Sequence, residues 1–211
     1  MNKTLEIKVC GMRNTQNILE VAALKPDYMG FIFFEKSPRN VTETASLETI
    51  LSLPKEIKKV GVFVNESLEN IVKTVRTFGL STVQLHGNES PDICKRLKVL
   101  KLEVWKAFSV DQNFDFETCK SYESTVDRFL FDTKGDGYGG HGKTFDWNIL
   151  KKYNQHVPFM LAGGISLENL TDLQLLDDLN IAGIDVNSKF ENSPGDKSIE
   201  KLQTLFEKIK A

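Results

Sequence analysis

Residues 58–85, KKVGVFVNESLENIVKTVRTFGLSTVQL, contain the repeating unit that decides the fold. A short apolar run, Lys58–Phe63, is followed by a segment of helical periodicity, Ser67–Phe78, and then by a second apolar run, Thr82–Leu85. Strand-length runs that alternate with amphipathic helices are typical of βα units whose strands form a parallel sheet. Ser67 stands where a helix N-cap is expected.

The same alternation extends from this unit toward both ends of the chain. The runs predicted as strands are Leu5–Val9, Tyr28–Phe33, Lys58–Phe63, Thr82–Leu85, Glu103–Ala107, Arg128–Phe131, Pro158–Leu161 and Ile181–Val186. The segments predicted as helices are Asn14–Leu24, Thr42–Leu53, Ser67–Phe78, Glu89–Leu97, Trp147–Tyr153, Leu167–Leu176 and Ile199–Ile209, the last with Ser198 as N-cap. Between Val110 and Asp127 the sequence is polar with scattered aromatic residues, which predicts a short or irregular helix there.

Eight such units predict an α/β protein, a single-domain (β/α)8 TIM barrel. A chain of 211 residues buries one substantial core, and no linker or low-complexity tract interrupts it. A doubly wound sheet with this many strands would need an antiparallel edge or a longer chain. Residues 1–211 are therefore predicted to form one catalytic domain.

Composition and charge indicate which binding partners and which cell compartment to expect. The formal net charge is only −2 with both signs dispersed, which argues against nucleic acid and against an anionic membrane. No segment approaches the roughly 20 apolar residues that span a bilayer. The three cysteines, Cys10, Cys94 and Cys119, are far apart and odd in number, so they predict reduced thiols rather than a disulfide scaffold or a zinc site. We expect a cytoplasmic protein.

In a barrel of this kind the chemistry lies in the loops that follow the strands. Gly163-Gly164 follows the seventh strand, and a helix is expected from about Ser166, so backbone N–H groups there can meet a phosphate. The eighth loop adds three polar residues, Asn187, Ser188 and Lys189. The alternative for the glycine pair is a tight turn without a ligand. Two adjacent loops of this type favour phosphate binding.

Four further residues stand at strand ends or in the loops that follow them. Asp132 ends an apolar run, where partial burial would favour its protonated form and let it act as an acid, although it is also read as a buried loop cap. Cys10 comes at the end of the first strand, where it is either a site residue or, more commonly for cysteine, a small buried apolar side chain. Arg39, in a proline-stiffened loop, suits a carboxylate or is an ordinary surface arginine. His86 is either a site residue or a polar group at a turn.

Residues 137–144, GYGGHGKT, satisfy the G-x-x-x-x-G-K-[ST] pattern of nucleotide-binding P-loops. Four residues separate the strand end at Asp132 from the first glycine, whereas a P-loop strand leads directly into it. Asp132 and Asp136 also place negative charge beside the supposed phosphate cradle. The glycines of 135–142 better suit a loop that closes over the barrel mouth. Lys134 and Lys143 either approach an anionic ligand or are solvated.

The ordered set of short segments resembles the phosphoribosylanthranilate isomerase family across nearly the whole chain. The segments that carry the resemblance are Lys8-Val-Cys-Gly-Met12, Gly30-Phe-Ile-Phe33, Ser37-Pro-Arg39, Gly61-Val-Phe-Val64, Val83-Gln-Leu-His-Gly87, Trp105-Lys-Ala-Phe108, Phe131-Asp132, Gly139–Trp147, Leu161-Ala-Gly-Gly164 and Gly183-Ile-Asp-Val186. Each is short, but their order and their placement, about one per strand, make the combined match specific.

The resemblance implies an Amadori rearrangement of N-(5′-phosphoribosyl)anthranilate to 1-(2-carboxyphenylamino)-1-deoxyribulose 5-phosphate in tryptophan biosynthesis. It implies Asp132 as general acid and Cys10 as general base, without a metal or redox cofactor. The start of the first helix is expected to favour the Cys10 thiolate. The substrate is expected to be held at both ends, its carboxylate by Arg39 and its phosphate by loops seven and eight, with Asp185 supporting the ribose or the loop.

Two departures from the family pattern affect the expected binding detail. The eighth loop reads Asn187-Ser188-Lys189 where the family commonly has Ser-Ser-Gly, and His141 stands where a small residue is common. The alternatives are another barrel sugar-phosphate isomerase or a barrel that binds a sugar phosphate without turnover. The expected partner is a small phosphorylated molecule, and the chain is expected to be a monomer or a homodimer.

Overall fold

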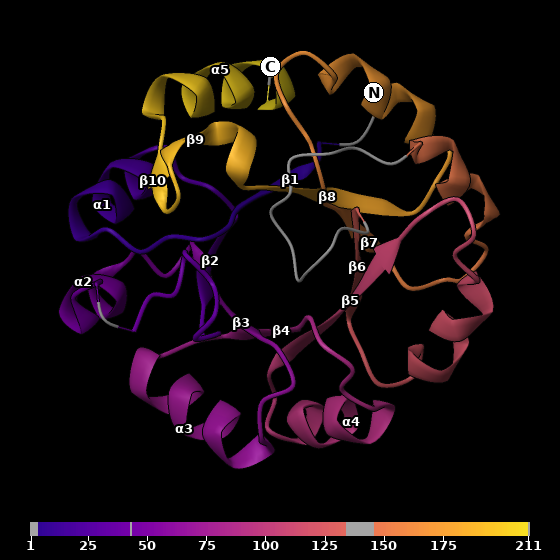
Figure 1. Ribbon diagram of the computed structural model, residues 1–211, viewed down its shortest axis with the longest axis horizontal. Helices are drawn as coiled ribbons and strands as arrows, with labels where there is room; N and C mark the ends of the chain where they lie inside the picture. The colour runs from indigo at the N-terminus through magenta and orange to yellow at the C-terminus, as the bar shows by residue number, and fades with distance from the viewer. Residues whose placement is uncertain (1–3, 43, 134–145, 211) are drawn as a thin grey trace.

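Eight parallel strands close into a barrel in the computed structural model, which describes residues 4–42, 44–133 and 146–210 (Figure 1). Neighbouring strands along the chain pair with one another, and the first strand pairs with the eighth. The strands are β1 Glu6–Val9, β2 Tyr28–Ile32, β3 Lys58–Phe63, β4 Thr82–Leu85, β5 Glu103–Val110, β6 Arg128–Thr133, β7 Phe159–Leu161 and β8 Ile181–Val186. The predicted TIM barrel is confirmed.

Helices surround the barrel (Figure 1). The α-helices are α1 Thr15–Ala23, α2 Leu47–Ser52, α3 Leu68–Phe78, α4 Pro91–Val99 and α5 Ile199–Lys210. The 3-10 helices are η1 Phe116–Tyr122, η2 Trp147–Lys152, η3 Leu170–Leu176 and η4 Ser188–Phe190. A small antiparallel hairpin, β9 Glu191–Ser193 with β10 Asp196–Lys197, follows η4 and was not predicted. No helix in the described part of the chain is long and apolar enough to cross a membrane.

Local capping explains where the predicted helix boundaries were right and where they were wrong. Ser67 caps α3, since its side chain accepts a hydrogen bond from the backbone N–H of Asn70. The second helix was predicted from Thr42, but it begins after Ser46, whose side chain accepts from Thr49 N–H. The helix after the seventh strand was predicted over Leu167–Leu176, but only the 3-10 helix η3 forms there, from Leu170. The predicted irregular fifth layer is η1.

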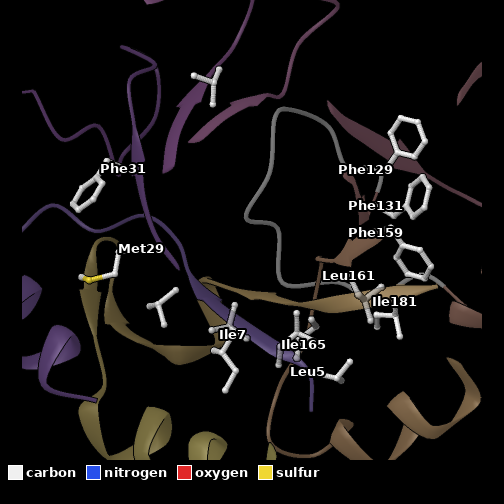
Figure 2. Packing of buried hydrophobic residues seen from close by; sticks show 14 of the residues in the cluster. Leu5, Ile7, Met29, Phe31, Phe129, Phe131, Phe159, Leu161, Ile165 and Ile181 are labelled. Carbon is white, nitrogen blue, oxygen red and sulfur yellow. The ribbon is translucent and has the colours of Figure 1, made fainter. Parts of the chain in front are cut away.

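Side chains along each strand alternate between the barrel interior and the layer under the helices. On β6, Phe129 and Phe131 point outward, while Leu130 lies in the interior cluster. Figure 2 shows Phe129, Phe131 and Phe159 grouped on one side of their strands, and these rings contact one another through Phe131. Each such buried side chain contributes about 1.5–3 kcal/mol. The same alternation turns Cys10 and Asp132 inward at the carboxyl ends of their strands.

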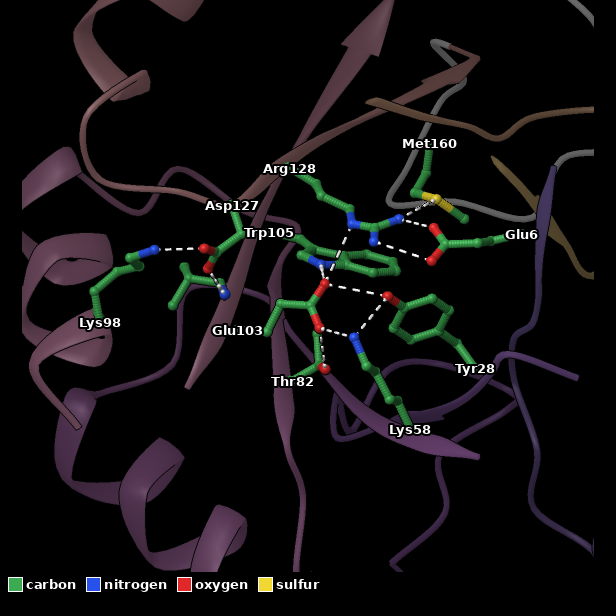
Figure 3. A network of polar contacts seen from close by, with 11 residues as sticks. Glu6, Tyr28, Lys58, Thr82, Lys98, Glu103, Trp105, Asp127, Arg128 and Met160 are labelled. Carbon is green, nitrogen blue, oxygen red and sulfur yellow. Dashed lines mark hydrogen bonds and ion pairs between the residues drawn. The ribbon is translucent and has the colours of Figure 1, made fainter. Parts of the chain in front are cut away.

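The amino ends of the strands are closed by a polar network that contains no predicted site residue (Figure 3). Glu103 lies at its centre and accepts hydrogen bonds from Lys58 Nζ and Trp105 Nε1, both at 2.9 Å. Arg128 Nε lies 3.2 Å from the same carboxylate, and its guanidinium also pairs with Glu6. We assign this network to the stability of the fold, because the chemistry of such barrels lies at the opposite end.

This network makes the stability of the fold depend on pH. Burial raises the pKa of Glu103, but hydrogen bonds from Lys58 and Trp105 and the charges of Lys58 and Arg128 outweigh it, so the pKa is lowered. The stabilisation is therefore complete above the unfolded pKa of about 4.3 and is lost as pH falls through the folded pKa. We expect Glu103→Gln to reduce the unfolding free energy at pH 7 and to have less effect at acid pH. Urea unfolding across that range checks this, and a pH-independent difference would contradict it.

Candidate active site

The carboxyl end of β1 places a lysine and a cysteine inside the barrel. Lys8 and Cys10 are two residues apart and so share the inward face of the strand. Lys8 is 0% exposed, and its Nζ donates to Asp185 Oδ2 and to Gln84 Oε1, both at 2.7 Å. A Cβ atom at Gly30 on β2 would lie 2.8 Å from Cys10 Sγ and 3.0 Å from Lys8 Cε, so glycine leaves room for both side chains.

The ionisation of Cys10 is governed by burial and by two kinds of neighbour. Burial raises the pKa of the Cys10 thiol, and the Asp185 carboxylate raises it further. The Lys8 ammonium opposes both effects through its charge and a hydrogen bond, and Lys197 opposes them through its charge. Helix α1 begins only at Thr15, and its cap, Asn14, accepts from Asn17 N–H. The pKa of Cys10 is raised overall, and Lys8 is the neighbour that opposes this rise most strongly.

Asp132 lies in β6, and its neighbours hold it at the barrel mouth. It is 7% exposed, and its Oδ1 accepts from Thr133 N–H at 2.8 Å. His86 Nε2 lies 3.5 Å from Asp132 Oδ2. Asp132 is thus the penultimate strand residue rather than the residue after the strand, because β6 is two residues longer than predicted.

The hydrogen bonds of Gln84 assign the tautomer of His86. Lys8 can only donate, so Gln84 must turn its Oε1 toward Lys8 and its amide nitrogen away. That amide nitrogen lies 2.8 Å from His86 Nδ1, which must therefore accept. A neutral His86 carries its proton on Nε2, the nitrogen that faces Asp132. The predicted site residue His86 consequently joins the surroundings of Cys10 to those of Asp132.

The seventh loop contacts the rest of the site through the backbone of its two glycines. Gly163 and Gly164 have φ angles of +83° and +68°, a conformation that other residues rarely adopt. A Cβ at Gly163 would lie 2.8 Å from Asp132 Oδ1 and would clash with Thr133, so the seventh loop directly abuts the carboxyl group. The N–H of Ser166 is already bonded to Asn169 Oδ1 at 2.9 Å. The expected N–H donation at Ser166 is therefore taken up within the loop.

Arg39 binds a carboxylate, but one that belongs to the protein. Its Nε donates to Glu191 Oε1 at 2.9 Å and its Nη2 donates to Glu191 Oε2 at 2.7 Å. Glu191 also accepts from Lys197 Nζ at 2.6 Å. The Arg39 side chain is only 11% exposed, so it is not an ordinary surface arginine. Among the described residues, the hydrogen bonds of the Arg39 guanidinium come from Nε and Nη2.

The three predicted residues of the eighth loop differ in their contacts and exposure. Asn187 Oδ1 accepts from Lys197 Nζ at 2.7 Å. A Cβ at Gly11 would lie 2.7 Å from Arg39 Cδ and 2.8 Å from Asn187 Oδ1, so both side chains lie beside the residue that follows Cys10. Ser188 is half-buried and Lys189 is exposed. The closing loop predicted at 135–142, with His141 and the flanking Lys134 and Lys143, lies outside the described residues.

Known proteins share both the sequence and the fold of this chain. A family model described as N-(5′-phosphoribosyl)anthranilate (PRA) isomerase matches residues 7–208. The chain belongs to this family. The N-(5′-phosphoribosyl)anthranilate isomerase of Parabacteroides distasonis is 47% identical over 207 residues, which cover 96% of this chain and 92% of that protein.

Solved structures of PRA isomerases share the whole barrel. Monomers generated from the dimeric phosphoribosylanthranilate isomerase of Thermotoga maritima match with a TM-score of 0.79 and 31% identity, covering 98% of each chain. A phosphoribosylanthranilate isomerase in complex with reduced 1-(o-carboxyphenylamino)-1-deoxyribulose 5-phosphate matches with a TM-score of 0.79 and 29% identity, again covering 98% of each chain.

Four residues that contact the predicted site residues were not predicted from the sequence: Lys8, Gln84, Glu191 and Lys197. Lys8 had a visible signal, because it is a charged residue on the inward face of an otherwise apolar strand and lies two positions before Cys10. Gln84 lies two positions before His86 on β4 and has the same signal. Glu191 and Lys197 had none, since they reach the site only through the unpredicted hairpin β9–β10.

Proposed function

We propose that this chain isomerises N-(5′-phosphoribosyl)anthranilate to 1-(2-carboxyphenylamino)-1-deoxyribulose 5-phosphate in tryptophan biosynthesis, with Asp132 as general acid and Cys10 as general base. The observation that carries the proposal is the pair of buried groups, one acid and one thiol, at the carboxyl ends of β6 and β1 in a chain that matches the family from end to end. The relative solved with the reduced product analogue supports the choice of substrate.

The reaction needs two proton transfers that these groups are suited to make. Asp132 donates a proton to the furanose oxygen while the anthranilate nitrogen pushes the ring open to a protonated Schiff base. That cation acidifies the C2′ proton, which the Cys10 thiolate removes to give an enolamine. The enolamine then tautomerises to the ketone. Cys10 ends the sequence as a thiol and Asp132 as a carboxylate, so a proton must return to Asp132 before the next turnover.

The two ends of the substrate would be held by opposite sides of this site. The phosphate would lie against Gly163, Gly164 and the Asn187–Ser188 backbone, the two loops that bind phosphate in many such barrels. Lys189 is exposed and would add charge from the rim. The anthranilate carboxylate would meet the Nη1 edge of Arg39, because the other edge is occupied by Glu191. Asp185 accepts a hydrogen bond from Lys8, so we propose that Asp185 supports the surroundings of the general base Cys10 rather than the ribose.

The role of Arg39 predicts a change in affinity. A charge-assisted hydrogen bond contributes about 1.5–3 kcal/mol, so we expect Arg39→Met to raise KM by roughly 10- to 100-fold. We expect kcat to change less, because Arg39 binds a part of the substrate that does not react. Steady-state kinetics measures both constants. Arg76→Met on α3, where the arginine is exposed, is the control and should leave KM unchanged. An unchanged KM in Arg39→Met would contradict the assignment.

The remaining proposals concern the state of the protein in the cell. Cys10, Cys94 and Cys119 are free thiols, which suit a reducing compartment, so we propose a cytoplasmic enzyme. We propose that residues 1–211 form one catalytic domain that is a monomer or a homodimer and takes a small phosphorylated substrate, not nucleic acid or a membrane.

The test of the activity is the continuous fluorescence of freshly generated phosphoribosylanthranilate in the presence of purified protein. Catalysed loss of the substrate signal is expected, at a rate proportional to enzyme concentration. A well-folded protein that binds the substrate without consuming it would instead identify a binding barrel, and one that does neither would point to a different sugar phosphate.

A further inference from the structure

We infer that Lys8 is a positioning residue whose buried ammonium acts as the counter-ion of the Cys10 thiolate. The inference rests on the proposed role of Cys10 as base, but its test does not depend on turnover. Lys8 is fully buried, lies on the same inward face of β1 as Cys10, and shares with it the space left by Gly30, where a Cβ atom would lie 3.0 Å from Lys8 Cε and 2.8 Å from Cys10 Sγ. The Lys8 ammonium is paired with Asp185, and this pair holds a buried positive charge beside the thiol.

Lys8 is held in the charged form by its partners. Burial lowers the pKa of Lys8, but the Asp185 carboxylate and Cys10 outweigh burial, so the pKa is raised above its ordinary value. Gln84 Oε1 accepts a second hydrogen bond from Nζ at 2.7 Å and fixes its direction. Lys8 therefore delivers a permanent, immobile positive charge to the side chain of Cys10.

Charged groups face Cys10 from three strands, and they act in opposite directions. Lys8 on β1 and Lys197 on β10 lower the pKa of the Cys10 thiol, while Asp185 on β8 raises it. The fourth neighbour, β2, presents Gly30 and adds no charge. Both lysines donate hydrogen bonds to other residues, but the charge of Lys8 lowers the pKa of Cys10 more than that of Lys197 does. Lys8 is consequently the neighbour that most strongly opposes the rise in the Cys10 pKa that burial causes.

The direct test is the ionisation of Cys10 in the free enzyme. The ultraviolet absorbance of the thiolate is titrated in wild type and in Lys8→Met, each minus the same protein carrying Cys10→Ser. We expect the titration of Cys10 in Lys8→Met to move upward by about 1–3 pH units, the range caused by losing an adjacent opposite charge. Lys8→Arg keeps the charge and should restore most of the wild-type titration.

Two further variants separate this role from a merely structural one. Lys106 is a second buried lysine, 3.4 Å from Glu89, but it lies on the outward face of β5. Lys106→Met should therefore leave the Cys10 titration unchanged. Asp185→Asn removes the negative neighbour and should move the titration downward, opposite to Lys8→Met. If Lys8→Met does not fold, Lys8→Gln, which stays polar toward Asp185 and Gln84, takes its place in the titration.

Turnover gives a second readout. The low-pH limb of the kcat/KM profile should move to higher pH in Lys8→Met and return in Lys8→Arg, with activity partly recovered at alkaline pH. A folded Lys8→Met protein whose Cys10 titrates as in wild type would overturn the inference, as would an Asp185→Asn protein in which the titration rises. If the thiol titration shifts as expected but wild type shows no turnover, the counter-ion stands and the proposed function fails.

Discussion

Asp132→Asn is expected to lower kcat by roughly 10²- to 10⁴-fold, the range contributed by a general acid. Asparagine keeps the shape of the side chain and the oxygen that accepts from Thr133 N–H, so the loop geometry should survive. It has no acidic proton to give to the furanose oxygen, so ring opening becomes limiting. The fluorescence assay measures the loss, and KM should change little because the carboxyl group acts on the reacting atoms.

Asp127→Asn is the matched control for this variant. Asp127 precedes the same strand at its amino end, where it pairs with Lys98 and accepts from Val104 N–H. Its replacement should reduce stability while kcat stays near that of wild type. A folded Asp132→Asn protein with a kcat close to wild type would rule out Asp132 as the acid.

Cys10→Ser is expected to cause a fall of similar size, roughly 10²- to 10⁴-fold in kcat. Serine fits the space beside Gly30, but its hydroxyl is a far weaker acid than a thiol, so even the Lys8 ammonium leaves almost no alkoxide. Removal of the C2′ proton then becomes limiting. Steady-state kinetics should also show that the limb of the pH profile assigned to the thiol disappears.

Cys94→Ser and Cys119→Ser control for the loss of a buried thiol. Both cysteines are fully buried in the layer between the barrel and its helices, and the Cys119 thiol has its pKa raised by burial to about 12, so it stays protonated. Both variants should lower stability and retain kcat. If Cys10→Ser kept most of the activity while folded, another group would have to remove the proton.

The part of the site that could be predicted lies on regular strands. Cys10 and Asp132 were placed correctly because the end of each apolar run marks the barrel mouth, and the period of two settles which side chains turn inward. The starts of the short α2 and of the 3-10 helix η3 were not predicted, because local hydrogen bonds such as the Ser46 cap and the Ser166–Asn169 bond shift a helix boundary without changing the apolar pattern.

Contacts between residues far apart in the sequence could not be predicted in this way. Lys8 and Asp185 are 177 residues apart, and Lys8 and Gln84 are 76 apart, so no local pattern joins them. Arg39 and Glu191, 152 residues apart, meet because the hairpin β9–β10 folds back against α1, where Lys197 and Asn17 exchange hydrogen bonds. Such pairings depend on which strands close the barrel and in what register.

The sequence by itself determined the eight βα units, the closed barrel, the family and the two groups proposed for proton transfer, because each follows from local hydrophobic periodicity or from short segments in a fixed order. Only the tertiary structure decided which charged residues surround Cys10, which nitrogen of His86 faces Asp132 and which carboxylate of the protein Arg39 binds. The reason is physical: a pKa, a tautomer and an ion pair are properties of neighbours in space, and in a closed barrel those neighbours come from strands far apart along the chain.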